Sequence, residues 1–194
     1  MKEKKVELGA VCGRFQVFHK DHLRYVLTAK DCCEHLLVGI TSADPSVSIQ
    51  EKYDQNRGTR AANPCTYFER MEIIKQVLLE AGLSYEEFDI VPFPIGKPEL
   101  VKFYIPVQAT CYFTVYDKWG EDKVRRMEKE GYHTKVLWEN REKGLSSTLI
   151  RECIAEGKEW KEFVPSAVYH YIKQFQIDQR ICRLMKSVKE GETE

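Results

Sequence analysis

The sequence lacks several features that would place it in a special class of protein. It has no internal repeat and no CxxC pair, and its seven cysteines are odd in number. With only 11 Gly and 7 Pro, 43% apolar and 31% charged residues, it is excluded from the disordered, collagen-like and coiled-coil classes. A chain of 194 residues buries enough surface to fold without covalent staples. Because most of the cysteines also lie in apolar stretches, we expect buried, reduced thiols, with a disulfide or a metal site as the alternatives.

Net charge and long apolar runs are also missing. Lys and Arg together number 30, as do Asp and Glu, so no overall positive field would attract a nucleic acid. The charged start, residues 1–5, is followed by only a short apolar run, which predicts neither a signal peptide nor a membrane-spanning helix. We therefore expect a cytoplasmic protein without nucleic-acid or membrane partners, in which any phosphate recognition is local.

Short apolar runs alternate with segments of helical period. The predicted strands cover residues 6–12, 35–41, 88–93, 111–116 and 135–138. The predicted helices cover residues 21–33, 66–81, 99–106, 119–131, 147–156 and 166–176, with a turn at 160–163. This order predicts an α/β fold: a Rossmann-like, doubly wound parallel sheet of about five strands with C-terminal helices, whose ligands bind beyond the carboxyl ends of the strands. We expect one domain over residues 1–185 and a flexible tail over 186–194.

The loop after the first predicted strand concentrates residues suited to bind phosphate. His19 and His22, two of the chain's five histidines, lie beside Arg14 at the predicted start of a helix. A helix N-terminus presents unpaired N–H groups and the positive end of its dipole, and both imidazoles could donate hydrogen bonds to the same anion. The alternative is structural: His19 would cap the helix, His22 would pack on the sheet and Arg14 would be a surface charge.

This run, GRFQVFHKDH over residues 13–22, resembles the GRFQPFHxGH signature of the HxGH-type nucleotidylyltransferase superfamily, in particular the nicotinamide mononucleotide adenylyltransferases of archaeal type. A second stretch, LSSTLIR over residues 145–151, is similar to the ISSTxIR motif of that family, and residues 63–71 are similar to the segment that opens the helix after its second strand. Two motifs in the right order are a much stronger signal than either alone. Without the resemblance, the late stretch would be interpreted as an ordinary N-cap cluster followed by a solvated arginine.

The resemblance implies site residues in both motifs. The catalytic residues would be His19, His22, Arg14 and Arg151, with the imidazoles donating to triphosphate oxygens and Arg151 holding the β- and γ-phosphates. The nucleotide would be bound by Gly13, Arg14, Phe15, Gln16, Ser146, Ser147, Thr148 and Arg151. Mg²⁺ would enter as the cofactor of the nucleoside triphosphate, bound mainly by phosphate oxygens and water, so we assign no protein side chain to the metal.

Departures from the family pattern concern the substrate. Asp21 stands where the family has glycine and Val17 where it has proline, and we expect the Asp21 carboxylate to cap the helix or approach a metal rather than touch phosphate. The position that would stack on nicotinamide falls at Val101 or Lys102, and the family's Thr-Gly-Asn becomes TVYDKW over residues 114–119. These changes predict a rebuilt acceptor pocket. Its candidate residues are Val101, Phe103, Tyr104, Asp117 and Trp119.

Residues 42–65 form a connection several times longer than the median of about 4–6 residues, so we expect a substrate lid or a partly disordered segment. The family's basic residue before Asn-Pro is absent here, because Ala61 and Ala62 occupy those positions. Arg57 or Arg60 would then swing onto the β- or γ-phosphate as the loop closes. As the alternative, both arginines are exposed charges.

Three hypotheses follow. In the main one, the enzyme transfers a nucleoside monophosphate, AMP from ATP, to a small phosphorylated acceptor such as nicotinamide mononucleotide and releases pyrophosphate. The alternative is a CTP-dependent cytidylyltransferase acting on another small phosphate, phosphonate or carboxylate acceptor. The third is a nucleotide sensor without turnover, in which Asp21 is the disabling change. The expected partners are a nucleoside triphosphate and a small-molecule acceptor, and homo-oligomer formation is left open.

Overall fold

The computed structural model describes residues 4–43, 58–139 and 144–190. Internal contacts divide the chain into two compact units. The first consists of Met1–Arg14, Arg24–Ala43 and Gly82–Lys143, and the second of Phe15–Leu23, Asp44–Ala81 and Gly144–Glu194. Helix α1 (Lys20–Asp31) begins in the second unit and continues into the first.

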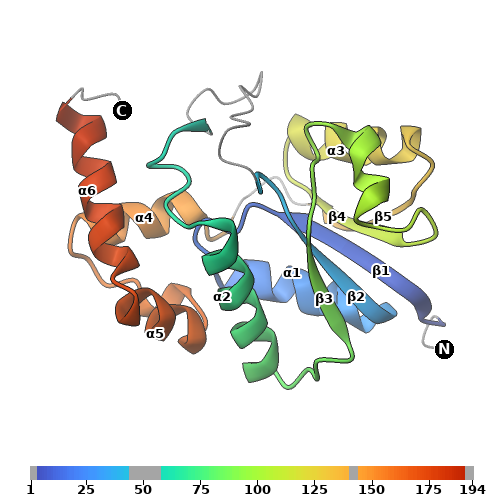
Figure 1. Cartoon of the computed structure of the whole chain (residues 1–194), viewed down its shortest axis with the longest axis horizontal. Helices are drawn as coiled ribbons and strands as arrows, with labels where there is room; N and C mark the ends of the chain where they lie inside the picture. The colour runs from blue at the N-terminus through green and yellow to red at the C-terminus, as the bar shows by residue number, and fades with distance from the viewer. Residues whose placement is uncertain (1–3, 44–57, 140–143, 191–194) are drawn as a thin grey trace. The chain divides into compact units, whose positions relative to one another are not determined.

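The first unit is built on a five-stranded parallel sheet (Figure 1). Its strands are β1 (Val6–Gly13), β2 (Cys33–Ile40), β3 (Phe88–Pro92), β4 (Thr110–Val115) and β5 (His133–Glu139). The strand order is β3-β2-β1-β4-β5, so the direction of winding reverses between β1 and β4. This arrangement confirms the predicted Rossmann-like α/β fold.

Helices cover both faces of this sheet, as continuous apolar strands require. On one face, Ala10 and Phe113 join a hydrophobic core with Met127 of α3 (Lys118–Lys129) and Val101 of the 3₁₀ helix η2 (Pro98–Phe103). On the opposite face, the ring of Tyr112 approaches Gly9 so closely that a Cβ there would lie 2.9 Å from it. That side of β4 faces α1.

The ladder between β1 and β4 is short. The two strands pair only at Gly9 with Thr110 and at Ala10 with Cys111, whereas β1 and β2 pair along their whole length. The buried hydroxyl of Tyr25 on α1 donates to the carbonyl of Tyr112 (2.6 Å) and accepts from the N–H of Cys12 (3.4 Å). The phenol therefore satisfies backbone groups of both strands beyond the end of their ladder.

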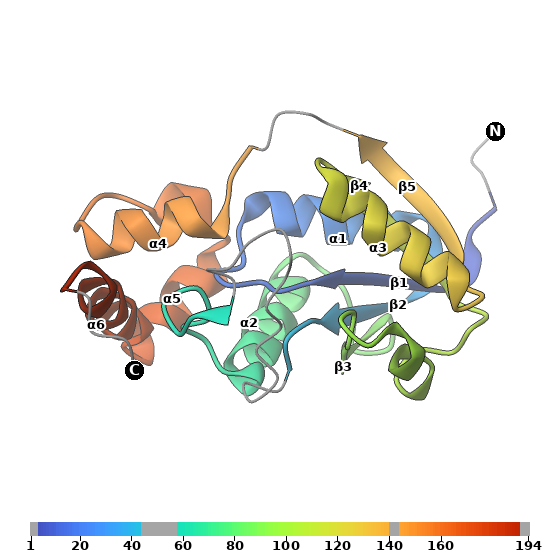
Figure 2. The same cartoon turned by 90° about the horizontal axis from the view of Figure 1, so that it is seen from above.

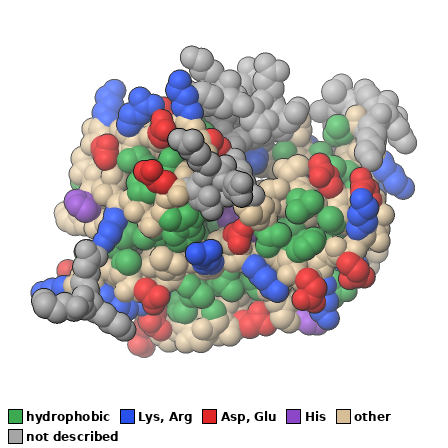
Figure 3. Space-filling view, turned by 180° about the vertical axis from the view of Figure 1, so that it is seen from behind, with side chains coloured by type: hydrophobic (Ala, Val, Ile, Leu, Met, Phe, Trp, Pro, Cys, Tyr) green, Lys and Arg blue, Asp and Glu red, His purple; other side chains and the backbone are tan. Residues whose placement is uncertain are grey.

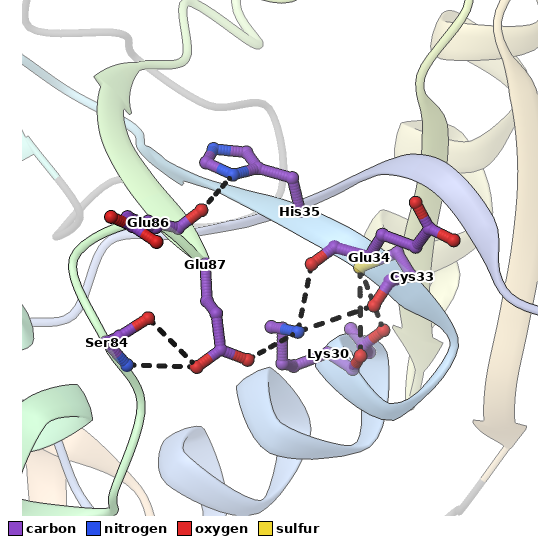
Figure 4. Close-up of polar contacts among 8 residues, drawn as sticks. Lys30, Cys33, Glu34, His35, Ser84, Glu86 and Glu87 are labelled. Atoms are coloured by element: carbon purple, nitrogen blue, oxygen red, sulfur yellow. Dashed lines mark hydrogen bonds and ion pairs between the residues drawn. The ribbon is translucent and has the colours of Figure 1, made fainter.

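A buried lysine joins the end of α1 to the beginnings of β2 and β3 (Figure 4). Lys30 Nζ donates to the carbonyl of Glu34 (3.0 Å) and pairs with the carboxylate of Glu87 (3.0 Å). The Glu87 carboxylate also accepts from the backbone N–H of Ser84 (3.0 Å), and these contacts lower its pKa to about 2. The charge on Lys30 is thus matched where the side chain leaves water.

The second unit is helical (Figure 2). Its helices are α2 (Tyr67–Glu80), α4 (Ser147–Ala155), the 3₁₀ helix η3 (Lys161–Phe163), α5 (Ser166–Gln174) and α6 (Ile177–Glu190), together with the first turn of α1. Thr66 and Glu69 form a capping box at the start of α2. Arg180 of α6 donates to Glu69 (2.7 Å) and to the carbonyl of Pro64 (3.0 Å), which fixes α6 to the start of α2.

Two predicted elements differ from the structure. Residues 99–106 were expected to form an ordinary helix, but η2 is a short 3₁₀ helix because Pro94, Gly96, Pro98 and Pro106 interrupt the segment. The tail was expected from residue 186, whereas α6 continues to Glu190. Residues 191–194 lie outside the described part of the chain.

No helix within the described residues is long and apolar enough to cross a membrane. Figure 3 shows basic and acidic side chains interspersed over the face that it displays, in keeping with equal totals of 30 for each sign. This mixture gives that face no extended field of a single sign.

Candidate active site

The histidine pair stands at the start of α1, in the second unit. The N–H of His22 donates to Nδ1 of His19 (3.3 Å), and the N–H of His19 donates to Nδ1 of His22 (3.4 Å). This reciprocal pattern is that of a capping box, with imidazoles in place of the usual hydroxyl and carboxylate. The spacing of three residues that marks the motif in the sequence is therefore also the spacing that closes the helix end.

These hydrogen bonds fix the tautomer of both rings. Because each Nδ1 accepts, each neutral imidazole carries its proton on Nε2. The rings stack with centroids 3.6 Å apart and planes inclined by 20°, so the two Nε2–H groups are presented side by side. Two parallel donors next to the N-terminus of a helix form an arrangement suited to an anion.

His19 is neutral at physiological pH. Its side chain is 4% exposed, and this burial lowers its pKa to about 4, against the opposing effect of the Asp21 carboxylate. The rings of His22 and Phe15 pack in a T-shaped arrangement, with centroids 5.0 Å apart and an interplanar angle of 84°. Phe15, which we predicted as a nucleotide-binding residue, is itself buried and supports the imidazole.

The late motif lies against the first loop, although 124 or more residues separate the bonded positions. Ser147 Oγ donates to the carbonyl of Val17 (2.9 Å), and the Leu145 N–H donates to the Asp21 carboxylate (2.7 Å). The buried Arg151 guanidinium donates to the carbonyl of Gln16. The predicted meeting of the two motifs is thus observed within one compact unit, whereas their binding of a triphosphate stays a prediction.

The start of α4 is capped by the motif itself. Ser146 Oγ accepts from the N–H of Leu149 (3.1 Å), and Thr148 Oγ1 accepts from Arg151 (3.2 Å). Ser146 is therefore the N-cap of α4, as the structural alternative predicted. The backbone N–H groups of the first turn of α4 are the further donors that this end of the helix offers to an anion.

Sequence reasoning missed the structural role of Gln16. Its buried side-chain amide donates to the carbonyl of Cys65 (2.8 Å) and accepts from the N–H of Cys65 (2.9 Å). This pair of bonds ties the residues before α2 to the first loop, in the manner of a short sheet ladder. The available signal in the sequence was a glutamine between aromatic and apolar residues, but this pattern does not identify its partner, which is 49 residues away.

Arg70 was not among the predicted site residues. The residue is 2% exposed, and burial lowers its pKa to about 10. Arg70 and Arg151 both act to lower the pKa of the Cys65 thiol, although burial dominates and raises that pKa to about 12. Both cations therefore lie within electrostatic range of one buried thiol, together with the Glu69 carboxylate, which raises the same pKa.

The remaining predicted residues divide between the first unit and the edge of the described chain. Gly13 ends β1, and Arg14, which follows it, is half-buried. Arg60 is exposed, and Arg57 lies outside the described residues, as does most of the predicted lid. The lid role of both arginines stays a prediction.

The predicted acceptor residues belong to the first unit. The side chain of Val101 is fully buried in the hydrophobic core, whereas Phe103 is 72% exposed. Asp117 caps α3 by accepting from the N–H of Gly120 (3.0 Å), and Trp119 lies under the guanidinium of Arg126 (5.1 Å from the ring centroid). Val101 fills the core, so Phe103 and the half-exposed Tyr104 are the rings of this segment that reach solvent.

Comparisons of sequence identify related proteins. The pattern of the family described as cytidylyltransferase-like matches residues 10–153. The chain is 42% identical over 173 residues to the phosphonoformate cytidylyltransferase of Streptomyces viridochromogenes, which covers 89% of this chain and 94% of that protein. It is 30% identical over 189 residues to the nicotinamide-nucleotide adenylyltransferase of Pyrococcus furiosus, covering 96% of this chain and 93% of that protein.

A comparison of structures gives the same fold. The chain superposes with a TM-score of 0.70 and 15% identity on a bifunctional NMN adenylyltransferase/ADP ribose pyrophosphatase from Francisella tularensis. The alignment covers 95% of this chain and 55% of that longer protein. At this level of identity the likeness concerns the fold alone.

Proposed function

We propose that this chain, which belongs to the cytidylyltransferase-like family and is a nucleotidyltransferase, transfers CMP from CTP. The proposed acceptor is a small molecule carrying a phosphonate and a carboxylate. The observation that carries the proposal is the 42% identity to a phosphonoformate cytidylyltransferase over 89% of the chain. The match to an archaeal nicotinamide-nucleotide adenylyltransferase is 30%. The relatives thus favour the alternative hypothesis, a CTP-dependent cytidylyltransferase, over the main hypothesis of AMP transfer from ATP.

The acceptor segment supports the same choice. A nicotinamide ring calls for an aromatic partner in the acceptor pocket, but one of the aligned positions is Val101, whose side chain is buried in the core. The neighbouring position is Lys102, whose ammonium lies 5.7 Å from the centroid of the Phe103 ring. A lysine suits a compact dianion better than a flat aromatic base.

The proposed reaction joins an acceptor oxygen to the nucleotide. A phosphonate oxygen, already ionised at neutral pH, attacks the α-phosphorus of CTP; the new P–O bond forms as the bond to the β-phosphate breaks, and pyrophosphate leaves. The protein then needs to position the groups and stabilise charge rather than supply a strong base. In this proposal the Nε2–H groups of His19 and His22 donate to triphosphate oxygens, and the N-terminus of α4, with Arg151 and Thr148, holds the β- and γ-phosphates.

Mg²⁺ enters this proposal as part of the nucleotide. Within the described residues no group of three or more His, Cys, Asp or Glu side chains is placed to hold a metal ion. Magnesium keeps much of its hydration and binds readily to phosphate oxygens, and its chemistry here would be to neutralise charge on the triphosphate. We include a cytoplasmic location and the absence of nucleic-acid and membrane partners in the proposal, and leave the oligomeric state open.

Pyrophosphate release tests the proposal. The purified chain is assayed with Mg²⁺ and each of the four nucleoside triphosphates, against phosphonoformate, other small phosphonates and nicotinamide mononucleotide. We expect release with CTP and a phosphonate acceptor. Release with ATP and nicotinamide mononucleotide, and not with CTP and any phosphonate, would overturn the proposal in favour of the adenylyltransferase. Nucleotide binding without release under any condition would favour the sensor.

A further inference from the structure

Asp21 connects the two motifs directly. It lies in the first turn of α1, between the members of the histidine pair, and its Oδ2 accepts from the N–H of Leu145 at 2.7 Å. A hydrogen bond from an N–H group to a carboxylate is shorter and stronger than one between neutral groups. The bond spans 124 positions of sequence, so it is a tertiary contact and no part of the local helix end.

The Asp21 carboxylate lies in the space that a side chain at Gly144 would occupy. A Cβ added at Gly144 would lie 2.5 Å from Asp21 Oδ2, closer than real Cβ contacts allow. Any side chain at Gly144 would therefore require the Asp21 carboxylate to move from the position that it occupies.

The contact acts on the start of α4. Leu145 directly precedes Ser146, the N-cap of that helix, and the next residue, Ser147, is bound to the carbonyl of Val17. Of these two hydrogen bonds from the late motif, one thus ends on Val17 in the loop before α1 and the other on Asp21 in the first turn of α1. These hydrogen bonds fix the position of the first turn of α4 relative to the two imidazoles.

The charge of Asp21 is also accounted for. A carboxylate beside a triphosphate would repel it, but here one carboxylate oxygen is bound to the Leu145 N–H, and the side chain stands in the first turn of α1, where the helix dipole favours negative charge. Asp21 therefore need not be the disabling change that the sensor hypothesis requires.

We propose that Asp21 is a positioning residue, which through the Leu145 N–H sets the start of α4 relative to the histidine pair and so determines the affinity for the triphosphate of the nucleotide. This inference rests on the proposed function. Asp21 itself touches no phosphate in this scheme. Its effect is exerted through the placement of the donors at the start of α4.

A double-mutant cycle tests the proposal, using Asp21→Gly, Gly144→Ala and the two changes combined. The measurements are the Kd of CTP and of pyrophosphate by calorimetry, kcat and KM for CTP, and the thermal unfolding midpoint. In the wild-type background, Gly144→Ala displaces the carboxylate, and we expect the Kd and KM to rise about 10- to 100-fold, the scale of one hydrogen bond to a charged group. In the Asp21→Gly background the added methyl group meets no carboxylate, so we expect Gly144→Ala to cause no further rise in the Kd or KM.

Two more variants sharpen the test. Asp21→Asn keeps an oxygen acceptor at the same distance from the backbone, and we expect it to retain most of the affinity that Asp21→Gly loses. Asp178→Asn is the matched control, because it removes a carboxylate from the first turn of α6, where its partner is the exposed Lys173. We expect this control to leave the Kd of CTP unchanged.

The outcomes separate the two proposals. If the wild type neither binds nor turns over any nucleoside triphosphate, the proposed function fails. If the wild type is active but Gly144→Ala costs the same in both backgrounds, the positioning role of Asp21 is wrong. A purely structural role would shift the unfolding midpoint of Asp21→Gly and leave its Kd for CTP and pyrophosphate at the wild-type value, which would also overturn the proposal.

Discussion

At the scale of single residues, the histidine pair combines two tasks. Each imidazole caps the helix through Nδ1, and this fixes the proton on Nε2, where an anion is expected to bind. One residue type therefore satisfies a backbone N–H and presents a donor to the ligand. Asn can reproduce the acceptor at Nδ1 and Gln the donor at Nε2, so substitution by each residue separates the two tasks.

His22→Asn places an amide oxygen near the position of Nδ1 and removes the distal donor. We expect it to remain folded with kcat lowered by about 10²–10³, the cost of one preorganised donor to a developing charge. His22→Gln, whose amide nitrogen reaches the position of Nε2, should recover part of that loss. The measurement is steady-state pyrophosphate release, with His170→Asn on the exposed surface of α5 as the control. Wild-type turnover in His22→Asn would remove this residue from the site.

The buried imidazole of His19 predicts a pH-dependent stability. Its pKa is about 4 in the folded protein against 6.5 ordinarily, so between these values the unfolded chain binds the extra proton. The stabilisation is present above pH 6.5, falls as the pH drops toward 4, and changes no further below that. Its full size is about 3 kcal/mol. Denaturant unfolding at several pH values should show a flatter profile for His19→Asn than for the wild type. Parallel profiles for the two proteins would contradict this assignment.

At the scale of elements, Tyr25 shows how a helix completes a sheet. The ladder between β1 and β4 ends early, and a hydroxyl from α1 satisfies one backbone group on each strand. The pKa of Tyr25 is raised well above its ordinary range by burial, so the phenol keeps its proton and can donate.

Tyr25→Phe tests this role. The substitution leaves the buried carbonyl of Tyr112 and the N–H of Cys12 without the hydroxyl, and we expect a loss of about 1–3 kcal/mol in the free energy of unfolding. Tyr85→Phe, on the exposed surface, is the control for loss of a phenol oxygen. The readout is chemical denaturation of both variants beside the wild type. Equal stability of Tyr25→Phe and the control would show that water replaces the hydroxyl at no cost.

At the scale of the whole molecule, the single domain over residues 1–185 stays a prediction. The chain alternates between the two compact units at several points, around residues 14, 23, 43, 81 and 143, so neither unit is a continuous stretch of sequence. We therefore expect one cooperative thermal transition, with equal calorimetric and van't Hoff enthalpies. Two resolved transitions in differential scanning calorimetry would contradict it, and a saturating nucleotide should raise the midpoint.

The sequence by itself determined the alternation of strands and helices, because apolar periodicity and helix caps are local. It also determined the spacing of His19 and His22, since three residues is both the motif and the geometry of a helix start. The pattern of two motifs was enough to predict the superfamily. None of these inferences required knowledge of which distant residues touch.

The tertiary structure alone decided the contacts between distant residues. The bond of Asp21 to Leu145, that of Gln16 to Cys65, and the bridge made by Tyr25 join residues that no periodicity relates. The burial of Val101 is of the same kind, since a valine in a proline-rich segment has no local mark of being in the core. Side-chain partners are chosen by packing in three dimensions, and for this reason a carboxylate that looked misplaced in the sequence has a defined place in the fold.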